Sequence, residues 1–310
     1  MTLIQPDNQI NLFGLDKYFN EIIELYKKKN LPTKILFSGQ KGLGKSTLSY
    51  HFINYVLSQG EEYSYDCKNL NINSKNRSYK TILNKSNPNF YLVDIDADKK
   101  FIDINQIRNL ITNLNKSSFN EKPRFILIDN IEYLNANSVN ALLKILEEPS
   151  TNVHFILINN NKKILSTLLS RCLNFKISLS HKESIIIANK LFDGNLDKFI
   201  NKDLLNYYIS PGNIYNLINF GNKNNYDLIN TNLENFLEIM IINKDYKKNK
   251  LTSFMIFDFI ELYFNKIAFS TSKKIFDKYS YFLKRISDTK RFNLDEETLF
   301  TEFKENILNG

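Results

Sequence analysis

The sequence predicts an α/β fold in which a doubly wound parallel sheet extends to about residue 178 and two helical domains follow. Three observations support this prediction. Short apolar stretches alternate with helical patterns in the first part of the chain. A glycine-rich loop, "GQKGLGKS", joins one apolar stretch to a helix. After about residue 180, the patterns are mostly helical and rich in Phe, Tyr and Ile.

The first elements lead into the glycine loop. Residues 16–28 predict a helix, because Tyr18, Ile22 and Leu25 recur at helical spacing while the charges fall elsewhere. The segment "TKILFSG" predicts a short buried strand, and residues 46–58 predict a second helix. The loop therefore lies between a strand and a helix, the setting in which a phosphate-binding loop occurs.

The rest of the sheet follows the same alternation. Nearly all-apolar segments predict three further parallel strands covered on both faces; they are residues 89–96, 124–130 and 153–159. Helical patterns occupy residues 104–114 and 137–149, the second ending at Pro149, and residues 164–172 predict a short helix or turn. Residues 60–80 are polar and lack periodicity, which predicts a loop.

The helical remainder predicts two domains. We expect three domains in all, at residues 1–178, 179–232 and 233–310, with breaks near "SPGN" and "NKDYKKNK". The aromatic stripes of residues 254–269 predict core in the first instance. They are also compatible with a subunit interface, and the sequence does not separate the two.

Composition limits the function classes. The net charge is +8, but the lysines are spread over the chain, which favours a general bias over a nucleic-acid stripe and leaves a modest basic face open. The two cysteines, Cys67 and Cys172, are far apart, so neither a four-ligand zinc site nor a disulfide framework is expected. No secretory signal and no apolar run of about 18 residues is present, so a soluble cytoplasmic protein is the default expectation.

The glycine loop carries the first chemical prediction. Gly39, Gly42 and Gly44 let the backbone curl so that successive N–H groups point at one anion. Lys45 is expected to reach the β- and γ-phosphates of a nucleotide, and the Ser46 hydroxyl to hold Mg²⁺. The positive end of the following helix adds to this attraction.

The second chemical prediction concerns the strand that ends at Asp129. A carboxylate at that end of a parallel strand can hold the Mg²⁺ of a bound nucleotide through water. The next residue, where many such ATPases have Glu, is Asn130, which cannot act as a general base. Glu132 is close in sequence, but an unknown turn sets its direction. The segment therefore predicts nucleotide binding without efficient hydrolysis.

The segment "NSVNALLKILEEPS", followed by "VHFILIN" and "SRC", resembles the clamp-loader branch of the AAA+ ATPases. The similarity is to the DNA polymerase III clamp-loader subunits of bacteria, of both the delta-prime and the gamma/tau type. It covers the first 180 residues strongly and the helical remainder more weakly. It implies an AAA+ P-loop domain, a small helical lid and a helical collar that oligomerises.

Several details resemble the delta-prime type in particular. In "SPGNIYNL", Asn213 follows Gly212 and no arginine is present, whereas motor subunits usually have a sensor arginine in this lid motif. The segment "RFNLDEETLFTEFKENIL" is similar to the family's last collar helix. Many family members carry four zinc-binding cysteines between the phosphate loop and the Asp-bearing strand, but here that region has only Cys67, so no zinc is expected.

The resemblance also implies roles and partners. Arg171 of the "SRC" segment would act in trans on the ATP site of a neighbouring motor subunit, and Asn159 either touches a γ-phosphate or simply ends its strand. The expected partners are motor subunits, the delta subunit, the sliding clamp and primed DNA. The predicted nucleotide-binding residues, with ATP and Mg²⁺ as the expected ligands, are Gly39, Gly42, Gly44, Lys45, Ser46, Thr47, Asp129 and Asn159.

Three functions remain in competition at this point. The first is a clamp-loader subunit of delta-prime type with weak or no hydrolysis of its own. The second is a gamma/tau-type motor with measurable turnover. The third is a stand-alone nucleic-acid-binding protein that depends on the positive charge.

Overall fold

The computed structural model describes residues 4–96, 99, 101–116, 120–147, 152–206, 209–248, 250–268, 273–292 and 294–308. The chain divides into two compact units. The first comprises Met1–Lys190 with Ser210–Asn213, and the second comprises Leu191–Ile209 with Ile214–Gly310. The expected domain boundaries near residues 178 and 232 stay predictions.

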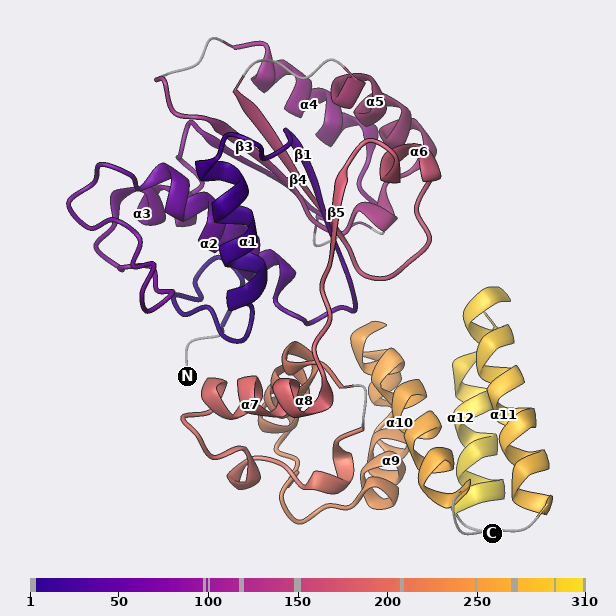
Figure 1. The fold of residues 1–310 in the computed structure, drawn as a ribbon. Coiled ribbons are helices and arrows are strands. Elements are labelled where there is room, and N and C mark those ends of the chain that lie inside the picture. The colour runs from indigo at the N-terminus through magenta and orange to yellow at the C-terminus, as the bar shows by residue number, and fades with distance from the viewer. Residues whose placement is uncertain are drawn as a thin grey trace. The chain divides into compact units, whose positions relative to one another are not determined.

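A five-stranded sheet forms the centre of the first unit (Figure 1). All its strand pairs are parallel, and the strand order is β2-β3-β4-β1-β5. The strands are β1 (Lys34–Ser38), β2 (Phe90–Val93), β3 (Arg124–Ile128), β4 (Val153–Asn159) and β5 (Leu173–Lys176). The predicted parallel sheet is confirmed. The sequence did not identify β5, a short edge strand in which only Phe175 is buried, so that the apolar run typical of the other strands is missing.

Both faces of the sheet are covered by helices, which explains the nearly continuous apolar character of the inner strands. Successive side chains alternate between the faces; along β1, Ile35 and Phe37 join one core and Leu36 joins the other. Helices α1 (Asp16–Lys27), α2 (Lys45–Leu57) and α3 (Arg77–Leu83) pack on the first face (Figure 1). On the second face lie α4 (Ile104–Leu114), α5 (Ala136–Glu147) and α6 (Ser166–Leu169).

The predicted helices correspond closely to α1, α2, α4 and α5. The predicted end of the fourth at Pro149 lies outside the described residues. Between α2 and β2 the prediction of a loop was incomplete, because the structure has the short helix α3 there.

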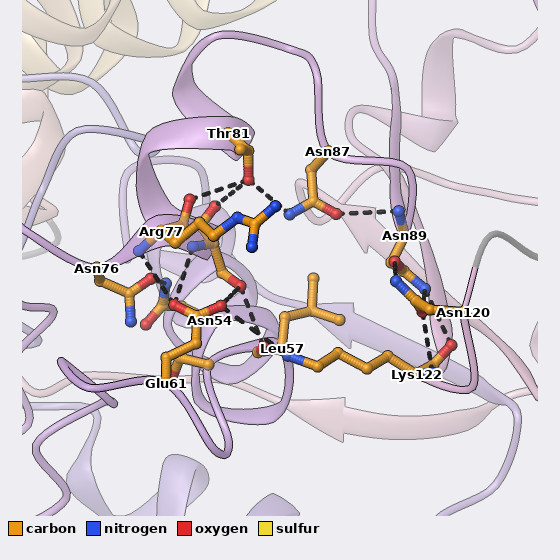
Figure 2. A network of polar contacts seen from close by, with 12 residues as sticks. Asn54, Leu57, Glu61, Asn76, Arg77, Thr81, Asn87, Asn89, Asn120 and Lys122 are labelled. Carbon is orange, nitrogen blue, oxygen red and sulfur yellow. Dashed lines mark hydrogen bonds and ion pairs between the residues drawn. The ribbon is translucent and has the colours of Figure 1, made fainter.

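Buried polar contacts hold the segment between α2 and β2 (Figure 2). Asn76 is fully buried and caps α3, since its side-chain oxygen accepts from the backbone N–H of Tyr79 at 2.7 Å. The same oxygen accepts from Asn54 Nδ2 at 3.2 Å, while Asn76 Nδ2 donates to the carbonyl of Tyr63 at 2.6 Å. One side chain therefore ties together α2, the loop and α3.

A second set of contacts fixes the start of α3 (Figure 2). The Glu61 carboxylate accepts from the backbone N–H groups of Arg77 and Ser78 at 3.0 and 3.1 Å. These N–H groups have no acceptor within the helix, and the negative charge of the carboxylate also interacts favourably with the positive end of the helix dipole. Lys122, which precedes β3 in the chain, donates to the carbonyl of Leu57 at 2.6 Å. The hydrogen bond from Lys122 thereby connects the end of α2 to the residues that lead into β3.

The second unit is helical. Its helices are the greater part of α8 (Pro211–Asn224), α9 (Leu233–Ile242), α10 (Lys250–Ala268), α11 (Lys273–Phe292) and α12 (Glu296–Phe303). Short 3₁₀ turns lie at Leu196–Lys198, Lys202–Leu204 and Asp245–Lys247, and a short π-helix lies at Lys304–Leu308. Helix α7 (His181–Leu191) belongs to the first unit except for its last residue. Fully buried aromatic rings, among them Phe257, Phe264 and Phe303, form the core of the second unit. The expectation of an aromatic core in residues 254–269 is thereby confirmed for Phe257 and Phe264. Within the described part of the chain, no helix is long and apolar enough to span a membrane.

We expect Asn76→Ala to lower the free energy of unfolding by about 2–4 kcal/mol. The substitution removes a helix cap, worth about 1 kcal/mol, and leaves the buried groups that it bonds without partners, at roughly 1–3 kcal/mol. Urea denaturation followed by circular dichroism measures the change. Asn109→Ala, on the exposed side of α4, is the matched control and should shift stability by less than about 0.5 kcal/mol. Equal stability of the two variants would contradict the conclusion that the Asn76 hydrogen bonds stabilise the packing of α2, the loop and α3.

Candidate nucleotide site

The glycine loop lies between β1 and α2 at the carboxyl edge of the sheet. Gly39, Gly42 and Gly44 have positive φ angles of 154°, 84° and 85°, the left-handed region that favours glycine. Gly44 is the residue before α2 and supplies no side-chain cap to the helix. The first N–H groups of α2, at Lys45, Ser46 and Thr47, therefore form an electropositive end of the kind that binds anions.

Lys45 is folded into the loop. Its residue is only 3% exposed, and Nζ donates to the carbonyls of Gly39 and Gln40 at 2.9 and 2.6 Å. Burial lowers the pKa of Lys45 to about 8, and the neighbouring carboxylates Asp129 and Glu132 act in the opposite direction. The ammonium is thus available to phosphates near neutral pH.

The structure brings Ser46 and Asp129 into direct contact. The Ser46 hydroxyl donates to Asp129 Oδ2, and the backbone N–H of Asn130 donates to Asp129 Oδ1 at 2.7 Å. Burial, assisted by the nearby Asp94, raises the pKa of Asp129 to about 6, and the hydrogen bond from Ser46 acts in the opposite direction. A hydroxyl and a carboxylate held together in this way suit a Mg²⁺ ion that also binds phosphate oxygens.

The residues after Asp129 form a network across three strand ends. Asn130 has the left-handed φ of 57°, which Asn tolerates better than most residues. Its Nδ2 donates to Asp94 Oδ1 at 2.7 Å, and its Oδ1 accepts from Asn160 Nδ2 at 2.8 Å. Glu132 follows in a 3₁₀ turn (Ile131–Tyr133) and accepts from the N–H and Nδ2 of Asn160 at 3.3 and 3.1 Å.

Two members of this network, Asp94 and Asn160, were missed by the sequence analysis. A signal was present, since both follow strands that end at the edge where the loop lies, and ligands bind at the carboxyl ends of parallel strands. Asn159, predicted as a site residue, instead closes a turn: its Nδ2 donates to the Lys162 carbonyl at 2.9 Å and its Oδ1 accepts from the Lys162 N–H at 3.2 Å. This geometry favours the strand-ending role of Asn159 over contact with a phosphate.

The segment Ser210–Asn213 packs directly on the loop. Ser210 Oγ donates to the Lys41 carbonyl at 2.8 Å, and the Gly212 N–H donates to the Gly42 carbonyl at 2.9 Å. A Cβ atom built on Gly212 would lie 2.8 Å from the Cα of Gly42, a distance that real side chains do not show. Two glycines are therefore needed where this segment meets the loop.

Arg171 lies elsewhere. It follows α6, its Nη2 forms an ion pair with Glu147 Oε1 at 2.7 Å, and its Nη1 donates to the Thr167 carbonyl at 2.9 Å. The next residue, Cys172, packs against the core, and burial raises the pKa of its thiol to about 11, so the thiol stays neutral.

Strand direction separates Arg171 from the phosphate loop. β5 runs parallel to β1, with Leu173 beside Ile35 and Lys176 beside Ser38. Arg171 comes just before β5, whereas Gly39 comes just after β1, so the two lie at opposite edges of the sheet. The five residues of β1 between them span roughly 16 Å at about 3.3 Å per residue.

A parallel sheet in this order, with a glycine loop after β1 and an aspartate after β3, defines a P-loop domain of the AAA+ class. The chain belongs to the family described as "DNA polymerase III, delta subunit", whose model matches residues 14–181. The resemblance to the delta-prime clamp-loader subunit expected from the sequence is thereby confirmed.

Individual relatives agree with this assignment. The DNA polymerase III subunit delta' of Buchnera aphidicola subsp. Schizaphis graminum is 32% identical over 178 residues, which cover 55% of this chain and 51% of that relative. The DNA polymerase III subunit gamma of the same organism is 30% identical over 153 residues, covering 48% and 39%. The matches to these two relatives span about half of their length, or less.

A solved structure is similar over nearly the whole chain. It is a DNA polymerase III, gamma subunit-related protein from Thermotoga maritima, with 16% identity, a TM-score of 0.50 and coverage of 95% of this chain and 97% of that one. At this identity the similarity concerns the fold alone. In the described residues, no group of three or more His, Cys, Asp or Glu side chains is arranged to hold a metal ion by itself.

We expect the affinity for Mg²⁺-nucleotide to be highest between about pH 6 and 8. Above the Lys45 pKa of about 8 the ammonium loses its proton, so raising the pH from 7 to 9 should weaken binding about 10-fold. Below the Asp129 pKa of about 6 the carboxylate is protonated and the Mg²⁺-dependent part of the affinity falls. Calorimetric titration at pH 5, 7 and 9 measures both limbs.

Lys45→Arg is the control for this pH profile, because a guanidinium keeps its charge at pH 9. The variant should lose the fall between pH 7 and 9, whatever its absolute affinity. An affinity of the original chain that stays constant over this range would contradict the assignment of the alkaline limb to Lys45.

Proposed function

We propose that this chain is a clamp-loader subunit of delta-prime type, which helps to load a sliding clamp onto primed DNA and supplies Arg171 to the ATP site of a neighbouring motor subunit. The observation that carries the proposal is the position of Arg171 at the sheet edge opposite its own phosphate loop. An arginine side chain does not span the length of β1, so Arg171 does not reach its own chain's phosphate loop, and this supports a role toward a nucleotide bound to another chain. Arginines supplied in trans to a γ-phosphate accelerate hydrolysis by roughly 10³- to 10⁵-fold.

The surface around Arg171 supports a protein contact. Three leucines next to it are unusually exposed for their type: Leu165 is 53% exposed, Leu169 39% and Leu173 40%. Exposed apolar side chains around an arginine are typical of interfaces, where buried arginines often contribute much of the binding energy.

The chain's own site fits a nucleotide. The first turn of α2 and Lys45 would hold the phosphates, and Ser46 and Asp129 would hold Mg²⁺. Bound ATP would supply a γ-phosphate open to attack by water. Asn130 has no basic group with which to activate that water, and its amide is already bonded to Asp94 and Asn160. The site therefore binds nucleotide and hydrolyses it weakly or not at all.

The proposed assembly defines the partners. They are the motor subunits and the delta subunit of the loader, with the clamp and primed DNA reached through the complex. Such a role places the chain with the replication machinery in the cytoplasm.

A gamma/tau-type motor is the second candidate, and one observation favours it. Glu132 is close enough to Lys45 to act on its pKa, and Asn160 holds the carboxylate in place. A carboxylate at this position is a potential base for the attacking water, and the phosphate loop is complete.

Arg171→Ala is expected to lower the DNA-stimulated ATPase of the assembled loader by about 10-fold or more, since the transition state in the neighbouring site loses its trans arginine. Steady-state phosphate release in the presence of clamp and primed DNA measures the effect. Arg77→Ala, at an exposed arginine of α3, is the matched control and should leave the rate unchanged. A loader with Arg171→Ala that keeps full activity would refute the trans role.

For the purified chain alone we expect ATP turnover near background, because Asn130 replaces the water-activating carboxylate. Phosphate release by the isolated chain, with Lys45→Ala as the control for contaminating ATPases, tests this expectation. Robust turnover that Lys45→Ala abolishes would instead favour the motor type, and loss of that turnover in Glu132→Gln would identify the base.

A further inference from the structure

The side chain of Arg171 is held at two points. Glu147, at the end of α5, accepts from Nη2 at 2.7 Å, and the carbonyl of Thr167 in α6 accepts from Nη1 at 2.9 Å. The arginine side chain is 33% exposed and the glutamate 53%. The guanidinium is thus fixed in place while part of it still faces outward.

The backbone beneath Arg171 is fixed as well. Its N–H donates to the carbonyl of Leu168 at 3.2 Å, and the N–H of Cys172 donates to the carbonyl of Leu169 at 3.3 Å. Leu168 is 2% exposed and belongs to the core. The main chain and both ends of the guanidinium therefore have defined positions.

We propose that Glu147 is a positioning residue for Arg171, which keeps the guanidinium in the orientation that enters the neighbouring subunit's ATP site. This inference rests on the trans role proposed above. A guanidinium has five N–H donors, and the contacts with Glu147 and Thr167 use two of them, so three remain for phosphate oxygens. Glu147 itself touches no substrate in this scheme.

The energetic role of Glu147 is to limit the number of rotamers that the Arg171 side chain samples. An ion pair as exposed as this one contributes little to folding stability, so its removal should leave the fold intact. A long side chain without the contact samples several rotamers, and ordering it again when the subunits meet the transition state reduces the rate. The effect belongs to the chemical step, because the neighbour's ATP binds to the neighbour's own phosphate loop.

The test uses Glu147→Gln in the loader assembled from this chain and its own partner subunits. We expect kcat for DNA-stimulated ATP hydrolysis to fall about 2- to 12-fold, the cost of immobilising one flexible side chain, with little change in KM for ATP. In the Arg171→Ala background the same substitution should have no further effect, because it acts only through the arginine. Glu24→Gln, at an exposed ion pair of α1, is the matched control and should leave kcat unchanged.

The remaining outcomes separate the inference from the proposed function. Normal kcat with Glu147→Gln, together with a reduced rate for Arg171→Ala, would overturn the positioning role and leave the trans role standing. A faster loader with Glu147→Gln would also overturn it, since the glutamate would then hold the arginine back. An equal fall of kcat in the Arg171→Ala background would show that Glu147 acts independently of the arginine. If Arg171→Ala itself has no effect, the proposed function fails.

Discussion

The direction of the β1 strand is the constraint on which the rest of the first unit depends. In a parallel sheet all carboxyl ends share one edge, so the phosphate loop after β1, Asp129 after β3 and Asn160 after β4 meet there. The same parallel arrangement puts the turn before β5 at the other edge. The parallel strand direction thus brings the residues of the candidate nucleotide site together at one edge and places Arg171 at the other. Under the proposed function, the same topology lets the chain hold a nucleotide of its own and present Arg171 to a nucleotide held by another chain.

The loop conformation has a second support, in the segment Ser210–Asn213. Helix α8 begins there with unpaired N–H groups, and the Gly42 carbonyl satisfies the one at Gly212. The Ser210 hydroxyl accepts from the Asn213 N–H and so caps the helix, while it donates to the loop at Lys41. The segment Ser210–Asn213 therefore has a structural role: it supports the loop through backbone groups and the Ser210 hydroxyl. This explains how two glycines far apart in sequence become mutually necessary.

Regular elements of the first unit could be predicted because their patterns are local. Apolar runs in β3 and β4 and the spacing of Ile107, Leu110 and Leu114 in α4 reflect burial on a sheet or a helix face. α3 could not be predicted, because its start depends on Glu61, 16 residues before Arg77, and on the buried Asn76. β5 has too few buried side chains to show a period.

The candidate site shows the same division between local and distant causes. Lys45, Ser46 and Asp129 belong to motifs whose spacing is short, so the sequence identified them. The direction of Glu132 depends on the left-handed backbone of Asn130 and on the amide of Asn160, which follows β4, and neither is visible in the local sequence. The contact between Arg171 and Glu147 joins residues 24 apart on different elements, and it appears only once α5 and α6 pack on the same face of the sheet.

Asn130 is matched to its surroundings, which bears on why no carboxylate directly follows Asp129. Its amide donates to Asp94 and accepts from Asn160, so one neutral group satisfies an acceptor and a donor. A carboxylate in the place of this amide would accept from Asn160 but would stand at hydrogen-bond distance from the Asp94 carboxylate. Asp94 already raises the pKa of Asp129, and another carboxylate in the same place would raise it further and weaken Mg²⁺ binding near neutral pH. We therefore expect a carboxylate at position 130 to be tolerated best together with a change at Asp94, because the two side chains form one unit.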